Sequence, residues 1–324
     1  VNGFLGPQFS LGSGVAQGCP LSPLLFLIIA EPLTRMMNKS GSVAGIHTFA
    51  NNKRTYHKIS QFADDSTLIL RLADIPGALK ILKTWEDATS MKENAAKREI
   101  LLLGTLRNHP EKLPPELQQC HIAADGTTIR ALGVPMGNNF DLKQWWTTRY
   151  RTVKRRISLW NGLARLSLTG RNILLQSILY GSMRYWFFTL PTPLSIVDMI
   201  ESDAKELLWA SNPEFHAEDD GTATTANRYM TWDASHLPQK QGGGSIMHLI
   251  SHIKAFQAQW TIKYLDPRDS PWKDVLDHWI IKDKHKIGRA IILTPGGARR
   301  INKIPARCTY MHLCFRCFQE LDVR

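Results

Sequence analysis

Two adjacent aspartates, Asp64 and Asp65, are the residues whose type and spacing most directly suggest chemistry. Residues 56–71 place a short apolar run on each side of the pair, which predicts two strands joined by a tight turn with both acids at its tip. Two carboxylates held together without basic neighbours repel each other unless a divalent cation neutralises them. We therefore expect the pair to hold Mg²⁺, or Mn²⁺ in its place, for two-metal phosphoryl transfer. The alternative interpretation is a polar hairpin turn with two solvated acids.

A second segment that could contact a nucleotide lies upstream of the acids. It runs from Gly14 to Pro23 and reads Gly-Val-Ala-Gln-Gly-Cys-Pro-Leu-Ser-Pro. Gly14 and Gly18 let the backbone approach a nucleotide or a template strand without an intervening Cβ. Gln17 adds amide donors and an acceptor beside them. The segment therefore has the residue types of a nucleotide-contacting loop.

These two segments, in this order and at this spacing, resemble the reverse transcriptases of non-LTR (LINE-type) retrotransposons. Motif B of that family reads G-x-x-Q-G-C-P-L-S-P, which residues 14–23 match without a break, and its catalytic motif is matched by Phe62-Ala63-Asp64-Asp65. The resemblance continues through a motif D-like segment at 94–99, a motif E-like segment at 132–136 and a thumb-like region at 160–191. It implies an RNA-directed DNA polymerase that uses an RNA template, a DNA primer and deoxynucleoside triphosphates.

The resemblance also implies roles for single residues. Gln17, Gly18 and Ser22 would line the pocket for the incoming nucleotide and the template base. Phe62 would pack near the primer end, with a buried strand aromatic as the alternative. Lys97 matches the motif D lysine, which would neutralise charge on the leaving pyrophosphate or donate a proton toward it. Its neighbour Arg98 departs from the small residue usual there, so a solvated Lys-Arg pair is the alternative interpretation.

One catalytic carboxylate of the family has no counterpart in this sequence. It belongs to motif A, upstream of motif B, and none of the 13 residues before Gly14 is Asp or Glu. The chain begins with Val1 and lacks a secretory signal pattern. We therefore expect a partial chain that lacks the endonuclease, the fingers and motif A, and that is inactive in isolation. Two alternatives are a catalytically dead nucleic-acid-binding remnant and an α+β domain without a nucleic-acid function.

The elements that must position these residues are expected to form an α+β fold. Helical spacing of Leu25, Ile28, Ile29 and Leu33 predicts a helix up to about residue 40, with Leu24–Ala30 as the start of a core helix. A second helix is predicted over 76–91, and short strands over 99–103 and 129–134. From residue 142 onward the patterns are long and helical. We assign a partial polymerase palm to 1–140, a helical thumb-like region to 141–212, a loop or linker to 213–244, and a basic, mainly helical C-terminal extension to 245–324.

The charge of the chain favours a polyanionic partner. There are 40 Lys and Arg against 28 Asp and Glu, a formal net charge of +12 at pH 7, which favours nucleic acid. Nine basic residues and no acidic residue lie between Lys143 and Arg184. We nominate the densest part of this stretch for phosphate contacts, namely Arg149, Lys154, Arg155 and Arg156. The stretch from Lys282 to Arg307 is expected to contact nucleic acid or to be a solvated surface.

The cysteines and the apolar runs limit the cellular setting. Five cysteines in 324 residues do not make a secreted disulfide framework, so we expect an intracellular protein, nuclear or cytoplasmic. The longest apolar run is far shorter than the roughly 20 residues that span a bilayer, so no membrane segment is expected. The C-terminal cluster contains Cys308, His312, Cys314 and Cys317 within ten residues. These residues leave little loop to wrap a metal, so zinc is not expected.

Overall fold

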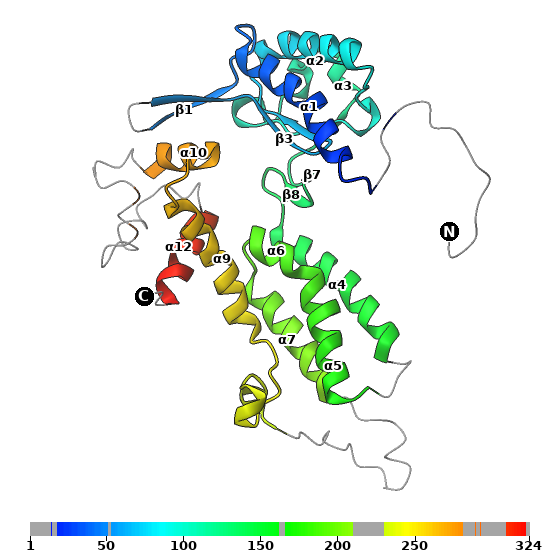
Figure 1. The fold of residues 1–324 in the computed structure, drawn as a ribbon, viewed down its shortest axis with the longest axis vertical. Helices are drawn as coiled ribbons and strands as arrows, with labels where there is room; N and C mark the ends of the chain where they lie inside the picture. The colour runs from blue at the N-terminus through cyan, green and yellow to red at the C-terminus, as the bar shows by residue number, and fades with distance from the viewer. Residues whose placement is uncertain are drawn as a thin grey trace, which may run out of the picture. The chain divides into compact units, whose positions relative to one another are not determined.

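The computed structural model describes residues 14, 18–50, 53–161, 166–209, 230–280, 289, 292 and 309–321. The chain divides into two compact units, which are described separately (Figure 1). The first unit comprises Val1–Leu102 and His109–Ile122, and the second comprises Leu103–Asn108 and Ala123–Arg324. The four-part division drawn from the sequence stays a prediction.

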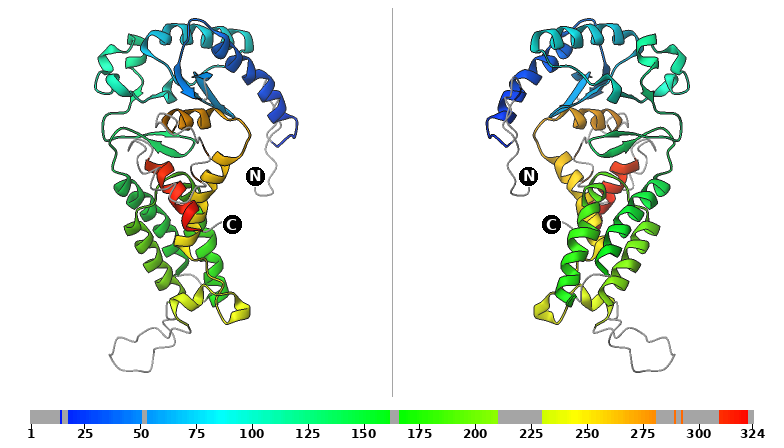
Figure 2. Two further views of the ribbon diagram at one scale, coloured as in Figure 1. Left: turned by 90° about the vertical axis from the view of Figure 1, so that its left-hand side faces the viewer. Right: turned by 90° about the vertical axis from the view of Figure 1, so that its right-hand side faces the viewer.

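The first unit combines two long helices with short sheets. Its elements are α1 (Ser22–Lys39), β1 (Ile46–Ala50), β2 (Lys53–His57), β3 (Ile59–Phe62), β4 (Asp65–Leu68), η1 (Leu72–Asp74), α2 (Ile75–Thr89), η2 (Ala95–Lys97), β5 (Glu99–Ile100), η4 (Pro110–Lys112), α3 (Pro115–Gln118) and β6 (His121–Ile122). β1 pairs with β2 and β3 with β4, both antiparallel, whereas β5 and β6 are parallel. α1 and α2 lie side by side in both views of Figure 2, and Leu33, Met37, Val43 and Ala78 form the small core between them and the strands.

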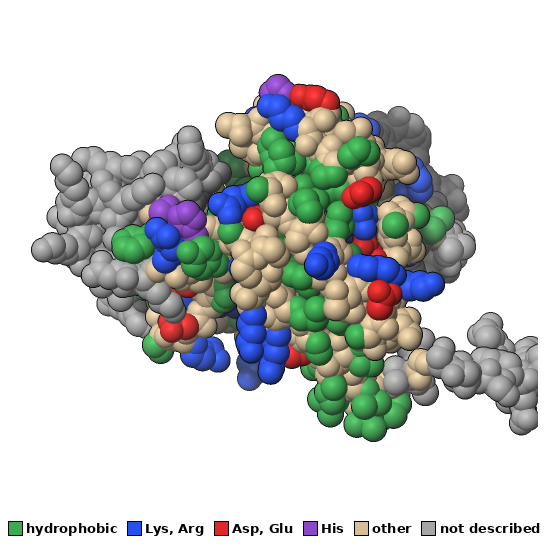
Figure 3. Space-filling model, turned by 90° about the horizontal axis from the view of Figure 1, so that it is seen from above, with side chains coloured by type: hydrophobic (Ala, Val, Ile, Leu, Met, Phe, Trp, Pro, Cys, Tyr) green, Lys and Arg blue, Asp and Glu red, His purple; other side chains and the backbone are tan. Residues whose placement is uncertain are grey.

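The helix predicted before residue 40 exists, but the expectation that its apolar first half starts a core was wrong. α1 places Pro23 in its first turn, where the missing N–H costs nothing. Leu33 is buried at 3% exposure, whereas Ile28 is 70% exposed and Leu25 and Ile29 are more than one-third exposed. In the space-filling view from above, groups of hydrophobic side chains, drawn in green, lie on the surface of the molecule (Figure 3). Helical spacing identified an apolar face, but the core of the first unit covers only its second half.

Two strand predictions require correction. The strand expected over 99–103 is limited to β5, because only Glu99 and Ile100 pair, in parallel with His121 and Ile122. The single strand expected over 129–134 is a hairpin, formed by β7 (Ile129–Ala131) and β8 (Val134–Met136). Its two turn residues, Leu132 and Gly133, have φ of 48° and 80°, which is the backbone that a tight two-residue hairpin requires.

The second unit is helical apart from this hairpin within its described residues. Its further elements are η3 (Gly104–Leu106), α4 (Leu142–Asn161), α5 (Leu168–Leu174), the π-helical η5 (Leu175–Tyr180), η6 (Gly181–Met183), α6 (Arg184–Thr189), α7 (Leu194–Trp209), α8 (Trp232–Ser235), η8 (Gln239–Gln241), α9 (Leu249–Leu265), α10 (Pro271–Ile280) and α12 (Thr309–Glu320). Residues 213–229 of the predicted loop or linker lie outside the described residues. Residues 237–244, at the end of the predicted loop or linker, form a turn closed by backbone hydrogen bonds such as Gly243 N–H to Pro238 O.

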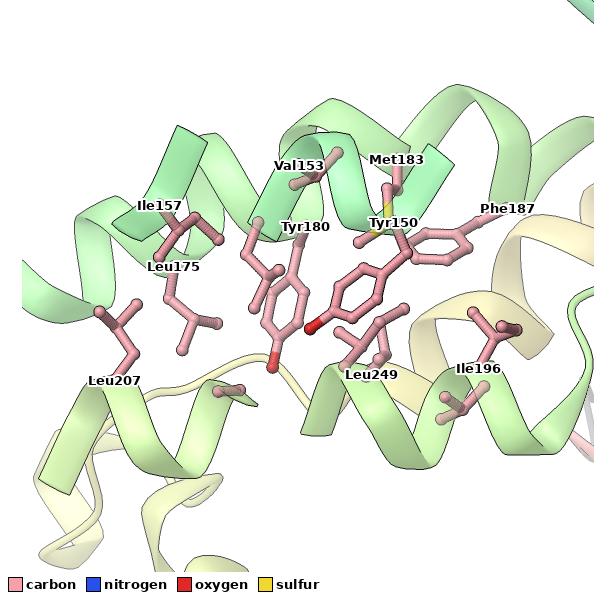
Figure 4. Packing of buried hydrophobic residues seen from close by; sticks show 14 of the residues in the cluster. Tyr150, Val153, Ile157, Leu175, Tyr180, Met183, Phe187, Ile196, Leu207 and Leu249 are labelled. Atoms are coloured by element: carbon pink, nitrogen blue, oxygen red, sulfur yellow. The ribbon is translucent and has the colours of Figure 1, made fainter. Parts of the chain in front are cut away.

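The main core of the second unit is built from α4, α5, η5, α6, α7 and the start of α9. α4 contributes Trp146, Tyr150, Val153 and Ile157, whose spacing of four, three and four residues forms one stripe along the helix. Figure 4 shows Tyr150 and Tyr180 among Leu175, Met183, Phe187 and Ile196. Trp145 and Trp186 pack against this cluster, so these tryptophans belong to the core.

The mixture of helices and short sheets is compatible with the predicted α+β fold class, while the polymerase palm and thumb stay predictions. None of the helices in the described ranges is long and apolar enough to cross a membrane.

Candidate functional site

The predicted acid-bearing hairpin is confirmed. β3 and β4 pair antiparallel with Phe62 opposite Asp65, which leaves Ala63 and Asp64 as a two-residue turn. Ala63 has a φ of 50°, in the left-handed region that such tight turns use. Ile59 and Leu68, paired at the other end of the hairpin, pack against the core of the first unit. The hairpin is therefore anchored at its base and presents both acids at its exposed tip.

Two side chains that sequence reasoning did not single out hold this hairpin against α1. The Lys58 ammonium is buried and donates to the carbonyl oxygens of Met37, Asn38 and Ser40 at 3.2, 3.1 and 3.0 Å. These carbonyls lie at the C-terminal end of α1, where a cation is favoured by the helix dipole. Thr34 of α1 also donates a hydrogen bond to the Gln61 side chain of β3. The sequence carries no signal for this role, because the burial of Lys58 depends on how the hairpin packs against α1.

The carboxylates of Asp64 and Asp65 are exposed and carry no hydrogen bond or ion pair to any described side chain. The described ranges also contain no group of three or more His, Cys, Asp or Glu side chains that could hold a metal ion. Two carboxylates alone still fit Mg²⁺, because this ion keeps several waters and takes one or two protein carboxylates together with substrate phosphates. Asp64 and Asp65 would hold it.

Phe62 is 67% exposed, so the alternative of a buried strand aromatic was wrong. Phe62 is paired with Asp65 across the two strands, so its aromatic ring lies beside the carboxylates and offers an apolar face on which another ring can stack. The hairpin tip therefore combines two acids and one exposed ring.

The motif B-like segment leads into the first turn of α1. Gly14 and Gly18 both have a φ of 91°, and a Cβ built on either would meet nothing within 4 Å. Their backbone therefore requires glycine and lies in open space, consistent with the expected approach of a ligand. Ser22 is the first residue of α1, and its backbone N–H donates to Cys19 O at 3.1 Å. Gln17 lies outside the described residues.

Lys97 ends the short helix η2 and is exposed, whereas Arg98 is fixed in a different role. The Arg98 guanidinium binds both carboxylate oxygens of Glu93, at 2.6 and 2.7 Å. This pairing raises the pKa of Arg98. The alternative of a solvated Lys-Arg pair was therefore wrong for Arg98. No hydrogen bond or ion pair between described side chains joins Lys97 to the acid hairpin.

The four nominated cations of α4 do not share one environment. Because each residue advances about 100° around a helix, Arg149 and Arg156 flank one side of the buried stripe and Lys154 flanks the other. The Arg149 guanidinium lies 5.5 Å from the Trp145 ring and 5.9 Å from the Trp186 ring. The Lys154 ammonium lies 2.7 Å from an Asp203 oxygen on α7. Arg155 and Arg156 are exposed.

One further arginine of α4 belongs with the exposed cations. Arg151 lies one turn before Arg155 and faces outward with it. Within the described ranges, none of Arg151, Arg155 and Arg156 has an acidic partner. These three guanidinium groups form the exposed basic face of α4. The apolar residues of α4 repeat with the helical period in the sequence, and this repeat could have shown that Arg151 lies on the outward side of the helix.

The motif E-like segment is held by α6. The Tyr185 hydroxyl donates to Leu132 O at 2.7 Å, and the Trp186 indole N–H donates to Gly133 O at 3.2 Å. Both acceptors are the turn residues of the β7–β8 hairpin. The two hydrogen bonds therefore hold the tip of this hairpin against α6.

The C-terminal cysteines lie in a packed helical interface. Cys314 and Cys317 of α12 are buried, and Cys317 Sγ donates to Gln257 Oε1 of α9 at 3.3 Å. Burial raises the pKa of Cys314 to about 12 and also raises that of Cys317. Burial lowers the pKa of His312. Cysteine binds zinc as a thiolate, so a metal at this place would have to ionise two buried thiols. The absence of zinc stays a prediction. Cys308 lies outside the described residues.

The basic stretch 282–307 was expected to contact nucleic acid or to be a solvated surface. Within this stretch the structure describes only Arg289 and Ile292. Arg289 binds the buried carboxylate of Asp277, with its Nη2 2.7 Å from Oδ2 and its Nε 3.1 Å from Oδ1. Tyr264 donates to the same carboxylate at 2.5 Å. At this residue the expectation was therefore wrong, because Arg289 stabilises the packing of α10 against α9.

No family model matches the chain. The chain is 25% identical over 313 residues to a Xenopus laevis protein described as a transposon TX1 uncharacterized 149 kDa protein. The alignment covers 94% of this chain and 22% of that protein, so the chain spans about a fifth of the relative's length. The chain is thus related to a transposon protein.

Proposed function

We propose that the chain is part of an RNA-directed DNA polymerase of a non-LTR retrotransposon. The observation that carries the proposal is the β3–β4 hairpin, whose exposed tip presents Asp64 and Asp65 beside the ring of Phe62. The glycine-dependent segment before α1 and the relationship to a transposon protein support it. The substrates would be an RNA template, a DNA primer and deoxynucleoside triphosphates.

The residues of the hairpin can do what this reaction needs from them. When bound, Mg²⁺ supplies the positive charge that activates the primer hydroxyl and steadies the leaving pyrophosphate. Asp64 and Asp65 would bind the ion through carboxylates that no described side chain neutralises. Phe62 would pack against the primer end, and the exposed Lys97 would face the pyrophosphate. Gly18 and Ser22 would contribute backbone and hydroxyl contacts to the nucleotide.

Metal binding can be tested without any activity. Mn²⁺ titrated into the ¹⁵N-labelled chain should broaden the amide resonances at the tip of the β3–β4 hairpin, which carries Asp64 and Asp65, because a bound paramagnetic ion relaxes nearby nuclei. The Asp64→Asn variant should lose this broadening. Glu116→Gln removes an exposed carboxylate from α3 of the same unit and should leave it unchanged. Equal broadening in Asp64→Asn and in the unsubstituted chain would contradict the metal assignment.

Primer extension tests the reaction itself. We expect the chain alone to extend no primer on an RNA template with Mg²⁺ or Mn²⁺, because the family's centre also uses a motif A carboxylate. In a longer protein that supplies this carboxylate, Asp64→Asn should abolish extension, while Asp65→Asn should reduce it. Robust extension by the chain alone, lost in Asp64→Ala, would refute the expected inactivity of the isolated chain. Equal tolerance of Asp64→Asn and Asp65→Asn in the longer protein would refute the assignment of the two carboxylates.

The second candidate function is a nucleic-acid-binding remnant without catalysis. The exposed basic face of α4 favours it, because Arg151, Arg155 and Arg156 need no metal to bind phosphates. The remnant would bind RNA with an affinity that Mg²⁺ does not change, and a longer protein would show no extension at all.

A further inference from the structure

A chain of hydrogen bonds links helix α1 to both strands of the β3–β4 hairpin. The Thr34 hydroxyl of α1 donates to Oε1 of Gln61 on β3. The other end of the same amide, Nε2, donates to Oγ of Ser66 on β4 at 3.0 Å. Gln61 and Ser66 are paired across the two strands. One glutamine side chain therefore joins the helix to the strand before the acids and to the strand after them.

These hydrogen bonds lie next to the acid-bearing tip. Phe62 and Asp65 form the next pair along the two strands, and Asp64 lies in the turn beyond them. Successive residues of a strand are about 3.4 Å apart along its axis. The pair that Gln61 and Ser66 form is therefore a single step of the strand away from the first carboxylate.

The hairpin needs support at this level because it is small. Each strand has four residues, and a two-stranded hairpin is marginally stable at best on its own in water. Its base is held by Ile59 and Leu68, which pack against the core, and by the Ile69 backbone N–H, which donates to Lys58 O at 2.8 Å. All these contacts lie at the end opposite the acids. Nearer the tip, Gln61 supplies the support.

A glutamine suits this place because its amide offers an acceptor and a donor at once. A glutamate would lack the donor and would add a third negative charge beside Asp64 and Asp65. Side chains alternate between the two faces of a strand, so Gln61 shares the face of the core residue Ile59, and Phe62 takes the opposite face. The Gln61 amide is therefore turned toward the body of the unit and braces the hairpin from behind.

We infer that Gln61 is a positioning residue for the metal site, because it fixes the hairpin tip, and with it Asp64 and Asp65, relative to α1 through Thr34 and Ser66. Groups that form a binding site must be held within about 0.5 Å of their productive positions. Loss of an outer support of a metal site typically lowers metal affinity or activity by about 10- to 100-fold. The inference rests on the proposed function for the role of the two carboxylates as metal ligands.

The test uses variants of the full chain that remove or keep single hydrogen bonds. Thr34→Val and Ser66→Ala each remove one hydroxyl, whereas Thr34→Ser and Ser66→Thr keep it. Gln61→Met removes both hydrogen bonds and keeps a side chain of similar length. Ser60→Ala is the matched control, because Ser60 is an exposed serine on the opposite face of the same strand.

The first measurement is the affinity for Mn²⁺, read from how the broadening of the amide resonances at the hairpin tip depends on metal concentration. We expect Gln61→Met to weaken binding by about tenfold or more, and Thr34→Val and Ser66→Ala to weaken it by up to about tenfold. Thr34→Val combined with Ser66→Ala should bind as Gln61→Met does, because both hydroxyls act through one amide. Thr34→Ser, Ser66→Thr and Ser60→Ala should bind as the unsubstituted chain does.

The second measurement needs no metal. ¹⁵N relaxation of the metal-free chain gives the order parameters of the backbone amides, which are about 0.85 in rigid backbone and below about 0.6 in flexible backbone. In Gln61→Met the order parameters of Ala63, Asp64 and Asp65 should fall toward the flexible range. Those of the β1–β2 hairpin should not change, which separates a loosened tip from a loss of folding.

Three results would overturn the inference. Unchanged order parameters at the tip in Gln61→Met would show that the amide does not fix the acids. Equal weakening of Mn²⁺ binding by Thr34→Val and Thr34→Ser, or by Ser66→Ala and Ser60→Ala, would show that these hydrogen bonds are not the cause. Both results leave the proposed function standing, because the unsubstituted chain still binds the metal. An unsubstituted chain without broadening at the tip would instead refute the metal assignment, and with it the role inferred for Gln61.

Discussion

Neutralising the exposed basic face of α4 gives a quantitative test of nucleic-acid binding by the second unit. We expect Arg151→Gln, Arg155→Gln and Arg156→Gln together to flatten the dependence of log affinity on log salt. Each phosphate contact contributes about 0.7 to 0.9 to this slope, so three contacts correspond to about 2.1 to 2.7. Because phosphate contacts carry no base information, the affinity should fall almost equally for templates of different sequence.

Lys154 is the matched control on the same helix. Its ammonium lies 2.7 Å from Asp203, whose carboxylate also accepts a hydrogen bond from the buried Tyr150 hydroxyl. A cation that is already paired releases few counterions when nucleic acid binds. Lys154→Gln should therefore leave the slope unchanged, although the sequence alone placed this residue among the binding set.

The measurement is fluorescence anisotropy of a labelled single-stranded RNA across a series of KCl concentrations. A charge control replaces three exposed lysines of the first unit, Lys80, Lys83 and Lys112, with glutamine. It changes the net charge by the same amount and should change the slope far less. An unchanged slope in a folded triple arginine variant would refute the assignment of α4, and so would a drop of a full unit in Lys154→Gln.

Three further outcomes are expected. Burial alone would raise the pKa of Asp74, but its hydrogen bonds lower it to about 2. The stability that this carboxylate adds is therefore present above about pH 4 and lost as the pH falls toward 2, by about 2 kcal/mol in denaturant titrations, and Asp74→Asn should remove this pH dependence. Iodoacetamide should label Cys19 first and Cys314 only after unfolding, as read by peptide mass spectrometry. The reason is that a hydrogen bond from the Leu21 backbone lowers the pKa of the exposed Cys19, whereas burial raises that of Cys314. Met37→Ala should cost about 2 to 5 kcal/mol of unfolding free energy, since Met37 is fully buried. A surface truncation such as Ile28→Ala should change it by less than about 0.5 kcal/mol.

The acid hairpin could be predicted because its signal is local. Two short apolar runs around Asp64 and Asp65 are enough to specify two strands and a tight turn, and the paired strands follow that pattern. The helices α2, α4 and α7 were equally accessible, because apolar residues repeat along them with the helical period. Short strands were predicted over 99–103 and 129–134, where β5 and the β7–β8 hairpin lie, but their bounds and pairing were not, because two or three residues are too few to show any period.

Side-chain environments were beyond the reach of the sequence. Periodicity indicates that one face of a helix is apolar but does not say what covers it, so the exposure of Ile28 could not be anticipated. The same holds for Phe62, whose exposed ring looks in the sequence like an ordinary strand residue. Burial depends on which other elements pack nearby, and those lie far away along the chain.

The sequence by itself determined the types of residue available for chemistry, their order, the basic character of the chain and most of its long elements. Tertiary structure alone decided which charges remain available. Lys154 of α4 meets Asp203 of α7, and Arg289 meets Asp277 of α10, whereas Arg155 and Arg156 keep exposed guanidinium groups. The physical reason is that an ion pair forms only when packing brings its partners within a few ångströms, and sequence separation does not encode that distance.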